Sequence, residues 1–220
     1  MEPSLSTRFD PSVEAHVLLG LARASIASAL GGPAPSLPEG AAYHQPGATF
    51  VTVHRGASLQ GCIGSLEAHR PLARDVCANA VAAALADPRG IALEARDLAS
   101  LRIEVSLLSP LERLPAASEA EAVRAIRPGV DGVVVARGTH RATFLPQVWA
   151  SLPDPLAFLH ALEQKAGLAP GSWDASTRLY RYAVRVFDEG APDGERVFDE
   201  GAPGGERVFD EGAPRGVGVS

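Results

Sequence analysis

The sequence is poor in the residues that build disulfide scaffolds and structural metal sites. Its 220 residues include only two cysteines, Cys62 and Cys77, and no Cys-x-x-Cys pair. Two isolated cysteines fit neither a disulfide framework nor a structural zinc site. A reducing compartment is therefore the simplest context for this chain.

Long apolar runs are also missing. No stretch of about 18 apolar residues is present that could span a bilayer, and residues 1–10 lack the apolar centre of a signal peptide. We therefore expect a cytoplasmic protein that does not associate with membranes. Apolar residues make up 46% of the chain and charged residues 21%, which allows one core or two small subdomains.

A basic excess is absent as well. The net charge is −6, and residues 188–220 carry nine acidic residues and three arginines, so residues 1–187 hold seventeen charges of each sign. Proteins that grip phosphate backbones usually show a basic excess. This balance makes nucleic-acid binding unlikely.

The most informative stretch is residues 59–66, LQGCIGSL, which places Cys62 between Gly61 and Gly64 after a strand-like run. Glycine tolerates backbone angles that other residues avoid, so this stretch predicts a sharp turn with N–H groups facing a bound anion or carbonyl. Cys62 is then either a nucleophile held in that turn or a small buried residue that fills space. The residues alone leave both interpretations open.

Helices and strands follow one another along residues 11–187. Asp10 and Pro11 predict the start of a helix over residues 11–30. Further helices are expected from Pro71 to about residue 86, from Ser118 to residue 127 and over residues 156–166, the last capped by Asp154. Strands are expected at residues 48–54, 101–107, 133–136, 140–144 and 178–187, together with one that leads into the thiol turn.

Several polar residues along these elements have two interpretations. Asp75 and Asn79 are one helical turn apart and form either a solvated stripe or a polar wall beside the thiol. Glu104, in an alternating strand, is either a surface residue or an acid or base of a cleft. Arg141 is either an exposed strand residue or a fork for a carboxylate or phosphate.

The end of the chain repeats itself with a period of eleven: residues 185–195 read RVFDEGAPDGE, 196–206 read RVFDEGAPGGE and 207–214 read RVFDEGAP. Units so rich in Gly, Pro and acid cannot bury enough surface to offset the entropy of ordering. We therefore expect an N-terminal arm at 1–11, a folded domain at 12–187 and a disordered acidic tail at 188–220.

Several blocks of sequence, in this order and spacing, resemble the AMMECR-domain family, which supplies the A component of the AmmeMemoRadiSam system. The blocks are ATFVT at 48–52, GCIGSLE at 61–67, PL at 71–72, DPR at 87–89, LRIEVS at 101–106, PGVDG at 128–132, TFLPQVW at 143–149 and YRY at 180–182. The resemblance implies an α+β fold of two subdomains around a mixed sheet with flanking helices. It also implies a MEMO-like protein and a radical-SAM enzyme as partners, and a cleft at the Gly-Cys-Ile-Gly loop. The chain departs from the family pattern at Gln60, where the family usually has Arg, and at Gly90, where it usually has an aromatic residue.

Two functions compete on this basis. In the first, the chain is an accessory or ligand-binding component whose cleft holds a small molecule or a partner segment. In the second, it is an enzyme in which Cys62 attacks a small acyl or carbonyl substrate, with Glu104 as an acid or base and His69, His54 or His140 as base. The candidate ligand-binding residues are Gly61, Ile63, Gly64, Ser65, Glu67, Asn79 and Arg141. A metal site made of Cys62, His69 and His140 is a further alternative, but we predict neither a metal nor a cofactor.

Overall fold

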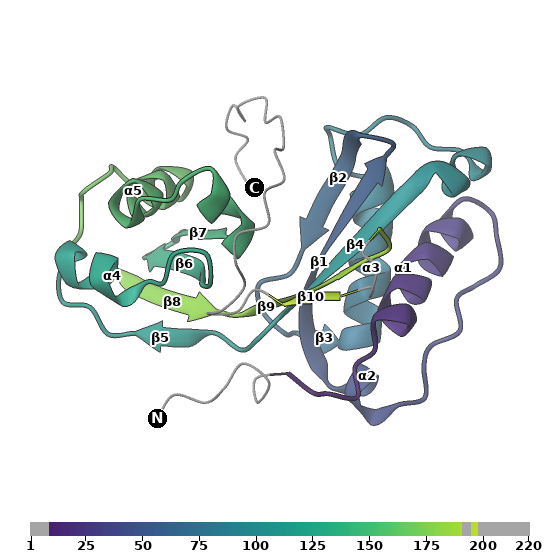
Figure 1. Cartoon of the computed structure of the whole chain (residues 1–220), viewed down its shortest axis with the longest axis horizontal. Coiled ribbons are helices and arrows are strands. Elements are labelled where there is room, and N and C mark those ends of the chain that lie inside the picture. The colour runs from purple at the N-terminus through teal and green to yellow at the C-terminus, as the bar shows by residue number, and fades with distance from the viewer. Residues whose placement is uncertain (1–8, 191–194, 198–220) are drawn as a thin grey trace. The chain divides into compact units, whose positions relative to one another are not determined.

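The computed structural model describes residues 9–190 and 195–197, which fall into two compact units. Unit 1 holds residues 9–111, 182–190 and 195–197, and unit 2 holds residues 112–181 (Figure 1). Each unit has its own sheet and its own apolar core. The predicted α+β class is confirmed, with two sheets in place of one mixed sheet.

Unit 1 is a six-stranded sheet whose strands follow the order β10-β9-β4-β1-β2, with β3 paired to one end of β1. Its elements are α1 (Ala15–Ala29), α2 (Ala41–His44), β1 (Pro46–Arg55), β2 (Ser58–Gly64), β3 (Arg70–Pro71), α3 (Leu72–Leu85), the 3-10 helix η2 (Ala95–Ser100), β4 (Leu101–Leu108), β9 (Val184–Asp188) and β10 (Glu195–Val197). All the strand pairs of this sheet are antiparallel.

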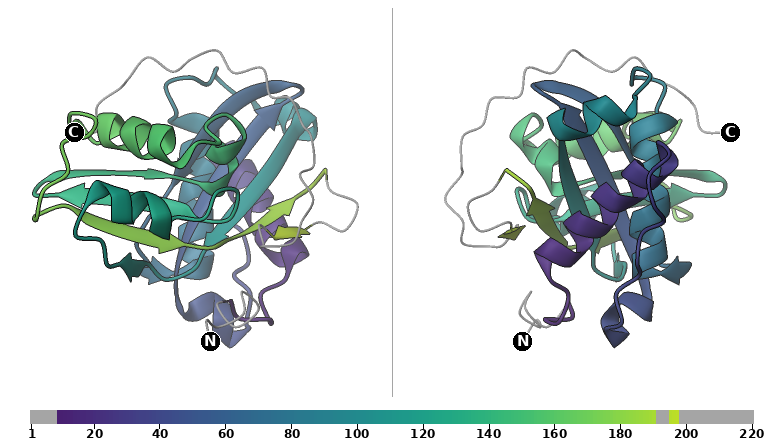
Figure 2. Two further views of the ribbon diagram at one scale, coloured as in Figure 1. Left: turned by 60° about the vertical axis from the view of Figure 1, so that its left-hand side comes forward. Right: turned by 90° about the vertical axis from the view of Figure 1, so that its right-hand side faces the viewer.

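The core of unit 1 lies between this sheet and α1 and α3, which cover the same face (Figure 2). Alternation along the strands sends Val51, Val53, Ile103 and Val105 to that face, and all four are fully buried. The small residues of α3 allow it to approach closely, because Ala80 and its neighbours add little bulk. The side chains of the alternate residues along each strand point to the opposite face of the sheet.

The first helix begins later than the sequence predicts. Asp10 does not cap α1; its Oδ1 accepts bonds from the backbone N–H and the hydroxyl of Ser12, at 2.9 and 2.6 Å, which closes a local turn instead. The helix starts at Ala15 with Glu14 as N-cap. The predicted cap Asp154 is confirmed, because its side chain accepts from the Ala157 N–H. Ser118, the predicted start of another helix, is the N-cap of that helix and accepts from the Glu121 N–H.

Unit 2 is a four-stranded sheet of order β5-β8-β6-β7 with two helices. Its elements are β5 (Glu112–Leu114), α4 (Glu119–Ala125), β6 (Gly132–Arg137), β7 (His140–Phe144), the 3-10 helix η3 (Pro146–Ala150), α5 (Pro155–Lys165) and β8 (Arg178–Tyr182). The strands predicted at residues 133–136 and 140–144 are confirmed as β6 and β7, which form a hairpin with Gly138 at a φ of 59° in its turn. Trp149 stacks on Phe158 at the centre of the core, 3.7 Å between ring centroids.

The strand predicted over residues 178–187 is two strands in different sheets. β8 ends at Tyr182 in the sheet of unit 2, and β9 begins at Val184 in the sheet of unit 1. Ala183 separates them and exchanges bonds with Ser109: Ser109 N–H donates to the Ala183 carbonyl, and the Ser109 hydroxyl accepts from Ala183 N–H. A continuous apolar pattern does not reveal such a change of sheet.

Part of the predicted tail is described. Asp188 is buried, and residues 195–197 form β10, which pairs with β9 so that Arg196 lies opposite Val186. Consecutive copies of the eleven-residue repeat thus lie side by side in the sheet. Residues 191–194 and 198–220 of the predicted tail lie outside the described residues. None of the helices in residues 9–190 and 195–197 combines the length and the hydrophobicity that a membrane-spanning segment needs.

Candidate functional site

Cys62 lies within strand β2 and not in a turn, so the expected glycine turn is wrong. Neither Gly61 nor Gly64 has a positive φ. They are glycines because other atoms come very close: a Cβ on Gly61 would lie 2.1 Å from the Ala83 carbonyl oxygen, and one on Gly64 would lie 2.2 Å from the Phe50 ring. The GCIG pattern therefore marks close packing of an outer strand, with no ring of N–H groups around the thiol.

Side chains on the sheet face opposite α1 and α3 form a polar row through Cys62. In register, Cys62 lies opposite Thr52, Thr52 opposite Glu104, and Glu104 opposite Asp188. We call the five half-buried residues here, Thr52, His54, Cys62, Arg102 and Glu104, the thiol face. Two of the candidate catalytic residues, Cys62 and Glu104, thus lie on one surface. The sequence alone placed Glu104 on a strand with one buried face and Cys62 in a turn, and it did not give the register between the strands.

The thiol of Cys62 is held in its neutral form. The Thr52 hydroxyl donates to Sγ at 3.3 Å. Burial raises the pKa of the thiol above its ordinary value, and this outweighs the lowering by the Thr52 hydrogen bond and by the charge of Arg89. His54 has a lowered pKa because it is partly buried and close to Arg102. The thiol face therefore presents a protonated thiol and a histidine that favours the neutral form.

Asp87 fixes the backbone beside the thiol. Its Oδ2 accepts from the Cys62 N–H at 2.9 Å, and its carboxylate also binds the Arg89 guanidinium at 2.7 Å and the Arg89 N–H at 3.0 Å. These bonds, led by the one from the Arg89 side chain, hold the pKa of Asp87 well below its usual range. A charged residue after α3 thereby anchors the outer strand that carries the thiol.

The two departures from the family pattern lie against each other. Gln60 is buried, and its Nε2 donates to the carbonyls of Ala84 and Ile91 at 2.9 and 2.7 Å. A Cβ on Gly90 would lie 2.4 Å from the Gln60 carbonyl oxygen and 2.6 Å from its Nε2. Gln60 and Gly90 therefore depend on each other: the Gln60 side chain occupies the space that a Cβ at position 90 would need.

Asp75 and Asn79 match neither of their two interpretations. Both are buried, and both face β1 from the helix side of the sheet, whereas Cys62 points to the other side. Asp75 accepts from the N–H and hydroxyl of Thr49, from Ser65 and from the Arg70 side chain, at 2.7 to 2.9 Å. Asn79 donates to the Thr49 carbonyl at 2.9 Å. This network holds the start of α3 to the sheet.

The remaining candidates are spread over the fold. Ile63 faces the core, Ser65 belongs to the Asp75 network, and Glu67 and His69 are exposed in the connection to β3. The His69 Nδ1 lies 2.9 Å from the Glu67 carbonyl. Arg141 and His140 lie on β7 of unit 2. Cys62, His69 and His140 do not come together within either unit.

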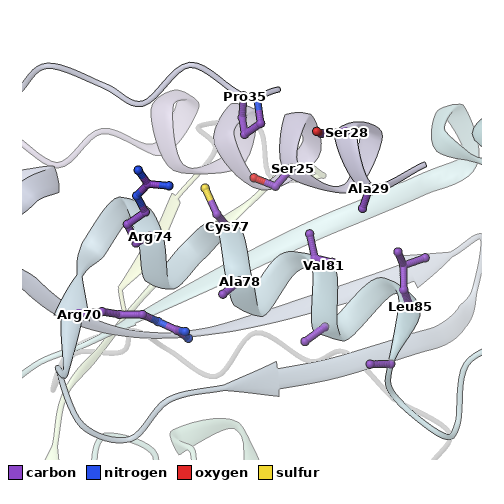
Figure 3. Close-up of a pocket in the computed structure, with 12 residues that line it drawn as sticks. Ser25, Ser28, Ala29, Pro35, Arg70, Arg74, Cys77, Ala78, Val81 and Leu85 are labelled. Atoms are coloured by element: carbon purple, nitrogen blue, oxygen red, sulfur yellow. The ribbon is translucent and has the colours of Figure 1, made fainter. Parts of the chain in front are cut away.

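A groove lies on the other side of unit 1, between α1 and α3 (Figure 3). Its volume is about 780 Å³ and its walls are mainly apolar, with Arg70 and Arg74 at one end. Cys77 lines it, with its sulfur directed toward α1, so this cysteine is partly exposed as well as packed. Cys62 does not line this groove. The groove is therefore not the cleft predicted at the Gly-Cys-Ile-Gly loop.

Sequence reasoning missed one cluster in unit 2. Glu119 at the start of α4 meets His160 and Glu163 of α5, with one potential ligand atom from each within 4.8 Å of the others. The spacing of His160 and Glu163, three residues apart on a helix, was the available signal. Nothing in the sequence paired these two with Glu119.

Comparison with known proteins gives one family. The AMMECR1 family model matches residues 19–187. A protein of Methanothermobacter thermautotrophicus is 36% identical over 185 residues, covering 80% of this chain and 94% of its own. One from Methanocaldococcus jannaschii is 34% identical over 164 residues, covering 73% and 81%. A crystal structure of an uncharacterised protein from Pyrococcus horikoshii has a TM-score of 0.74 at 30% identity, covering 83% of this chain and 96% of that one.

Proposed function

Because the chain belongs to the AMMECR1 family, we propose that it is an accessory, ligand-binding component of a radical-SAM-associated system, with the thiol face as its binding surface. The partners that the family resemblance implies are a MEMO-like protein and a radical-SAM enzyme. The protein would act in the cytoplasm. We also propose that a small-molecule ligand binds at the thiol face.

The state of Cys62 is the observation that favours binding over catalysis. A cysteine nucleophile needs a lowered thiol pKa and a base within hydrogen-bond reach. Here the pKa of the thiol is raised, and the group that bonds to Sγ is a hydroxyl that donates to it. In this role Cys62 shapes the surface and does not attack a substrate.

The rest of the thiol face supports a recognition surface. Arg102, Glu104 and His54 supply both signs of charge and several hydrogen-bonding groups within two adjacent strands. All are half-buried, so their strands hold them in place at little cost in entropy on binding. Such a surface can read the charge pattern of a peptide segment or of a small polar molecule.

The proposal is tested by co-purification with the two partners under anaerobic conditions, using charge reversal on the thiol face. We expect Glu104→Lys to abolish or strongly weaken association while the far-ultraviolet spectrum stays native. Glu39→Lys, an equal charge change at an exposed loop position, is the matched control and should bind normally. Absence of association by the unaltered protein, or full association by Glu104→Lys, would overturn the proposal.

Cys62→Ser separates the binding role from the alternative, a cysteine-nucleophile enzyme acting on a small acyl or carbonyl substrate. Serine can still accept the bond from Thr52, so a binding surface should retain its partners. An enzyme would lose its covalent step. If Cys62→Ser keeps its association with the partners and the activity of the assembled three-protein system is unchanged, the binding role is supported. If association is kept but that activity is lost, the cysteine-nucleophile enzyme is supported.

A further inference from the structure

Unit 2 brings three ligand-type side chains, Glu119, His160 and Glu163, to one place. Ser118 caps α4 and makes Glu119 its first residue, while α5 presents His160 and Glu163 three residues apart on one side of the helix. The two helices contact each other in unit 2 (Figure 1). One ligand atom from each side chain lies within 4.8 Å of the other two.

The distances are close to those of a coordination site. Metal–ligand bonds of about 2.0 to 2.2 Å place the donor atoms of a tetrahedral site roughly 3.3 to 3.6 Å apart. The His160 Nε2 now lies 2.8 Å from Glu119 Oε1, which is a hydrogen bond. A shift of about half an ångström between these two side chains would admit an ion in its place.

Glu163 is a second, independent observation that points to a cation at this cluster. The residue is 1% exposed, and only one of its carboxylate oxygens is satisfied: Oε2 accepts from the Gly171 N–H at 2.8 Å. Oε1 is buried and has no hydrogen-bond partner. A buried, unpartnered carboxylate oxygen is costly unless a proton or a cation meets it.

The access and the charge suit a cation. The side chains of Glu119 and His160 are 29% and 35% exposed, so an ion can reach them from solvent. Two carboxylates and one neutral imidazole carry a charge of −2, which a divalent ion would balance. The neighbouring cation Arg137 is held by Ser172 and Asp174. Gly171, at a φ of +72°, brings backbone to the edge of the cluster, and a Cβ there would lie 3.6 Å from His160 Nε2.

We propose that Glu119, His160 and Glu163 bind a divalent transition-metal ion of the Zn²⁺ type, with a fourth position open to water. Imidazole nitrogen together with carboxylate oxygen selects such ions over Mg²⁺ and Ca²⁺, which prefer oxygen alone. Three protein ligands and one open position are the arrangement of reactive zinc sites rather than of structural ones. This site is independent of the function proposed for the thiol face.

The test is titration of the full-length, tag-free, chelator-treated protein with Zn²⁺ by calorimetry, with elemental analysis after dialysis. We expect one Zn²⁺ per chain. His160→Gln and Glu119→Gln should each weaken binding at least about 10- to 100-fold, the range that the loss of even an outer-shell partner typically costs. His69→Gln and Cys62→Ser are the controls and should bind like the unaltered protein.

Glu163→Gln distinguishes metal binding from simple packing. Glutamine can still accept from Gly171 N–H and removes a buried charge, so the metal-free protein should melt at the same temperature or higher. The increase in Tm that Zn²⁺ gives the unaltered protein should disappear. In parallel, Co²⁺ should give the strong visible absorption of a four-coordinate site in the unaltered protein but not in His160→Gln.

Three outcomes would overturn the site. The unaltered protein could fail to bind Zn²⁺ stoichiometrically, the ligand variants could bind as tightly as the unaltered protein, or binding could depend on Cys62 and His69. The second outcome would leave a proton on Glu163 as the explanation of its buried oxygen, and the third would place the metal elsewhere.

Discussion

At the scale of single residues, one hydroxyl and one strand position set the chemistry of Cys62. The Thr52 hydroxyl donates to Sγ and stabilises the thiolate, whereas burial opposes ionisation and prevails. A thiol in this state is a weak nucleophile at neutral pH. Its contribution to the thiol face is shape, polarizability and one accepted hydrogen bond.

The raised thiol pKa gives a prediction about reactivity. Alkylation of Cys62 by iodoacetamide, followed by peptide mass spectrometry against pH, should have its midpoint above that of the same peptide in urea, because only the thiolate reacts. Thr52→Val removes the hydrogen bond that lowers the pKa, so the midpoint should move still higher. A midpoint at or below that of the unfolded chain would restore Cys62 as a candidate nucleophile.

Gly61 is a second residue whose identity is fixed by contact. Any Cβ at this position would meet the backbone oxygen of Ala83, at 2.1 Å, and the Asp87 Cβ, at 2.6 Å. Backbone atoms of a packed helix cannot move aside easily, so Gly61→Ala should lower the free energy of unfolding by about 2 to 3 kcal/mol.

Urea denaturation measures that loss, with Gly56→Ala as a comparison at a site of different character. Gly56 is a turn glycine with a φ of 60° and open space around it, so its cost should come from backbone strain alone. A Gly61→Ala protein as stable as the unaltered chain would show that β2 can move away from α3.

At the scale of elements, polar side chains hold α3 and β2 to the sheet at both ends of the helix. The Asp75 network attaches the first turn of α3 to β1, and Asp87 attaches the segment after the helix to β2. Both carboxylates are buried and accept several bonds, an arrangement in which a buried charge is stabilised. The outer strand thereby keeps its register although it has a neighbour on one side only.

Asp87→Asn tests this attachment and gives a pH signature. The amide lacks the charge and one of the two acceptor oxygens that Arg89 and Cys62 use, so the variant should be less stable by about 2 kcal/mol at pH 7. The folded-state pKa of Asp87 is depressed, so its contribution is present above the unfolded pKa, near 3.8, and is lost as the pH falls below it.

The stability difference between the two proteins should therefore be constant at neutral pH and shrink below about pH 4. Chemical denaturation at a series of pH values measures it. A difference that persists unchanged at pH 2.5 would mean that packing of Asp87, and not its charge, supports the strand.

At the scale of the whole molecule, the folded region extends beyond the last residue that the family model covers. Glu189 donates its N–H to the Ile103 carbonyl, and its carboxylate accepts from Ile103 N–H at 2.8 Å and from Arg23 at 2.6 and 2.8 Å. These bonds join β9, β4 and α1. A truncation that includes Glu189 therefore removes part of the fold of unit 1.

A truncation and a substitution should differ in their effect on stability for this reason. Removal of residues 198–220 should leave Tm almost unchanged, because repeats rich in Gly, Pro and acid bury little surface. Glu189→Ala in the full chain should cost about 1 kcal/mol, since its ion pair is partly exposed but its bond to Ile103 N–H is not replaced. Equal Tm values for Glu189→Ala and the unaltered chain would show that the Glu189 side chain does not stabilise unit 1.

The sequence by itself determined the class of the fold, most of its elements and the family. Alternation and caps are local properties, so β4, α4, α5 and the β6–β7 hairpin could be predicted from the sequence. The sequence also identified Cys62 and Glu104 as candidate site residues. Only the tertiary structure decided what depends on contacts distant in sequence. It assigned Gly61 to close packing instead of a turn, broke one predicted strand between two sheets at Ala183, and brought Glu119 to His160 and Glu163. Local sequence patterns carry no information about which residues distant in sequence come into contact. Those contacts determine the pKa of the thiol and the hydrogen-bond partners of each buried carboxylate.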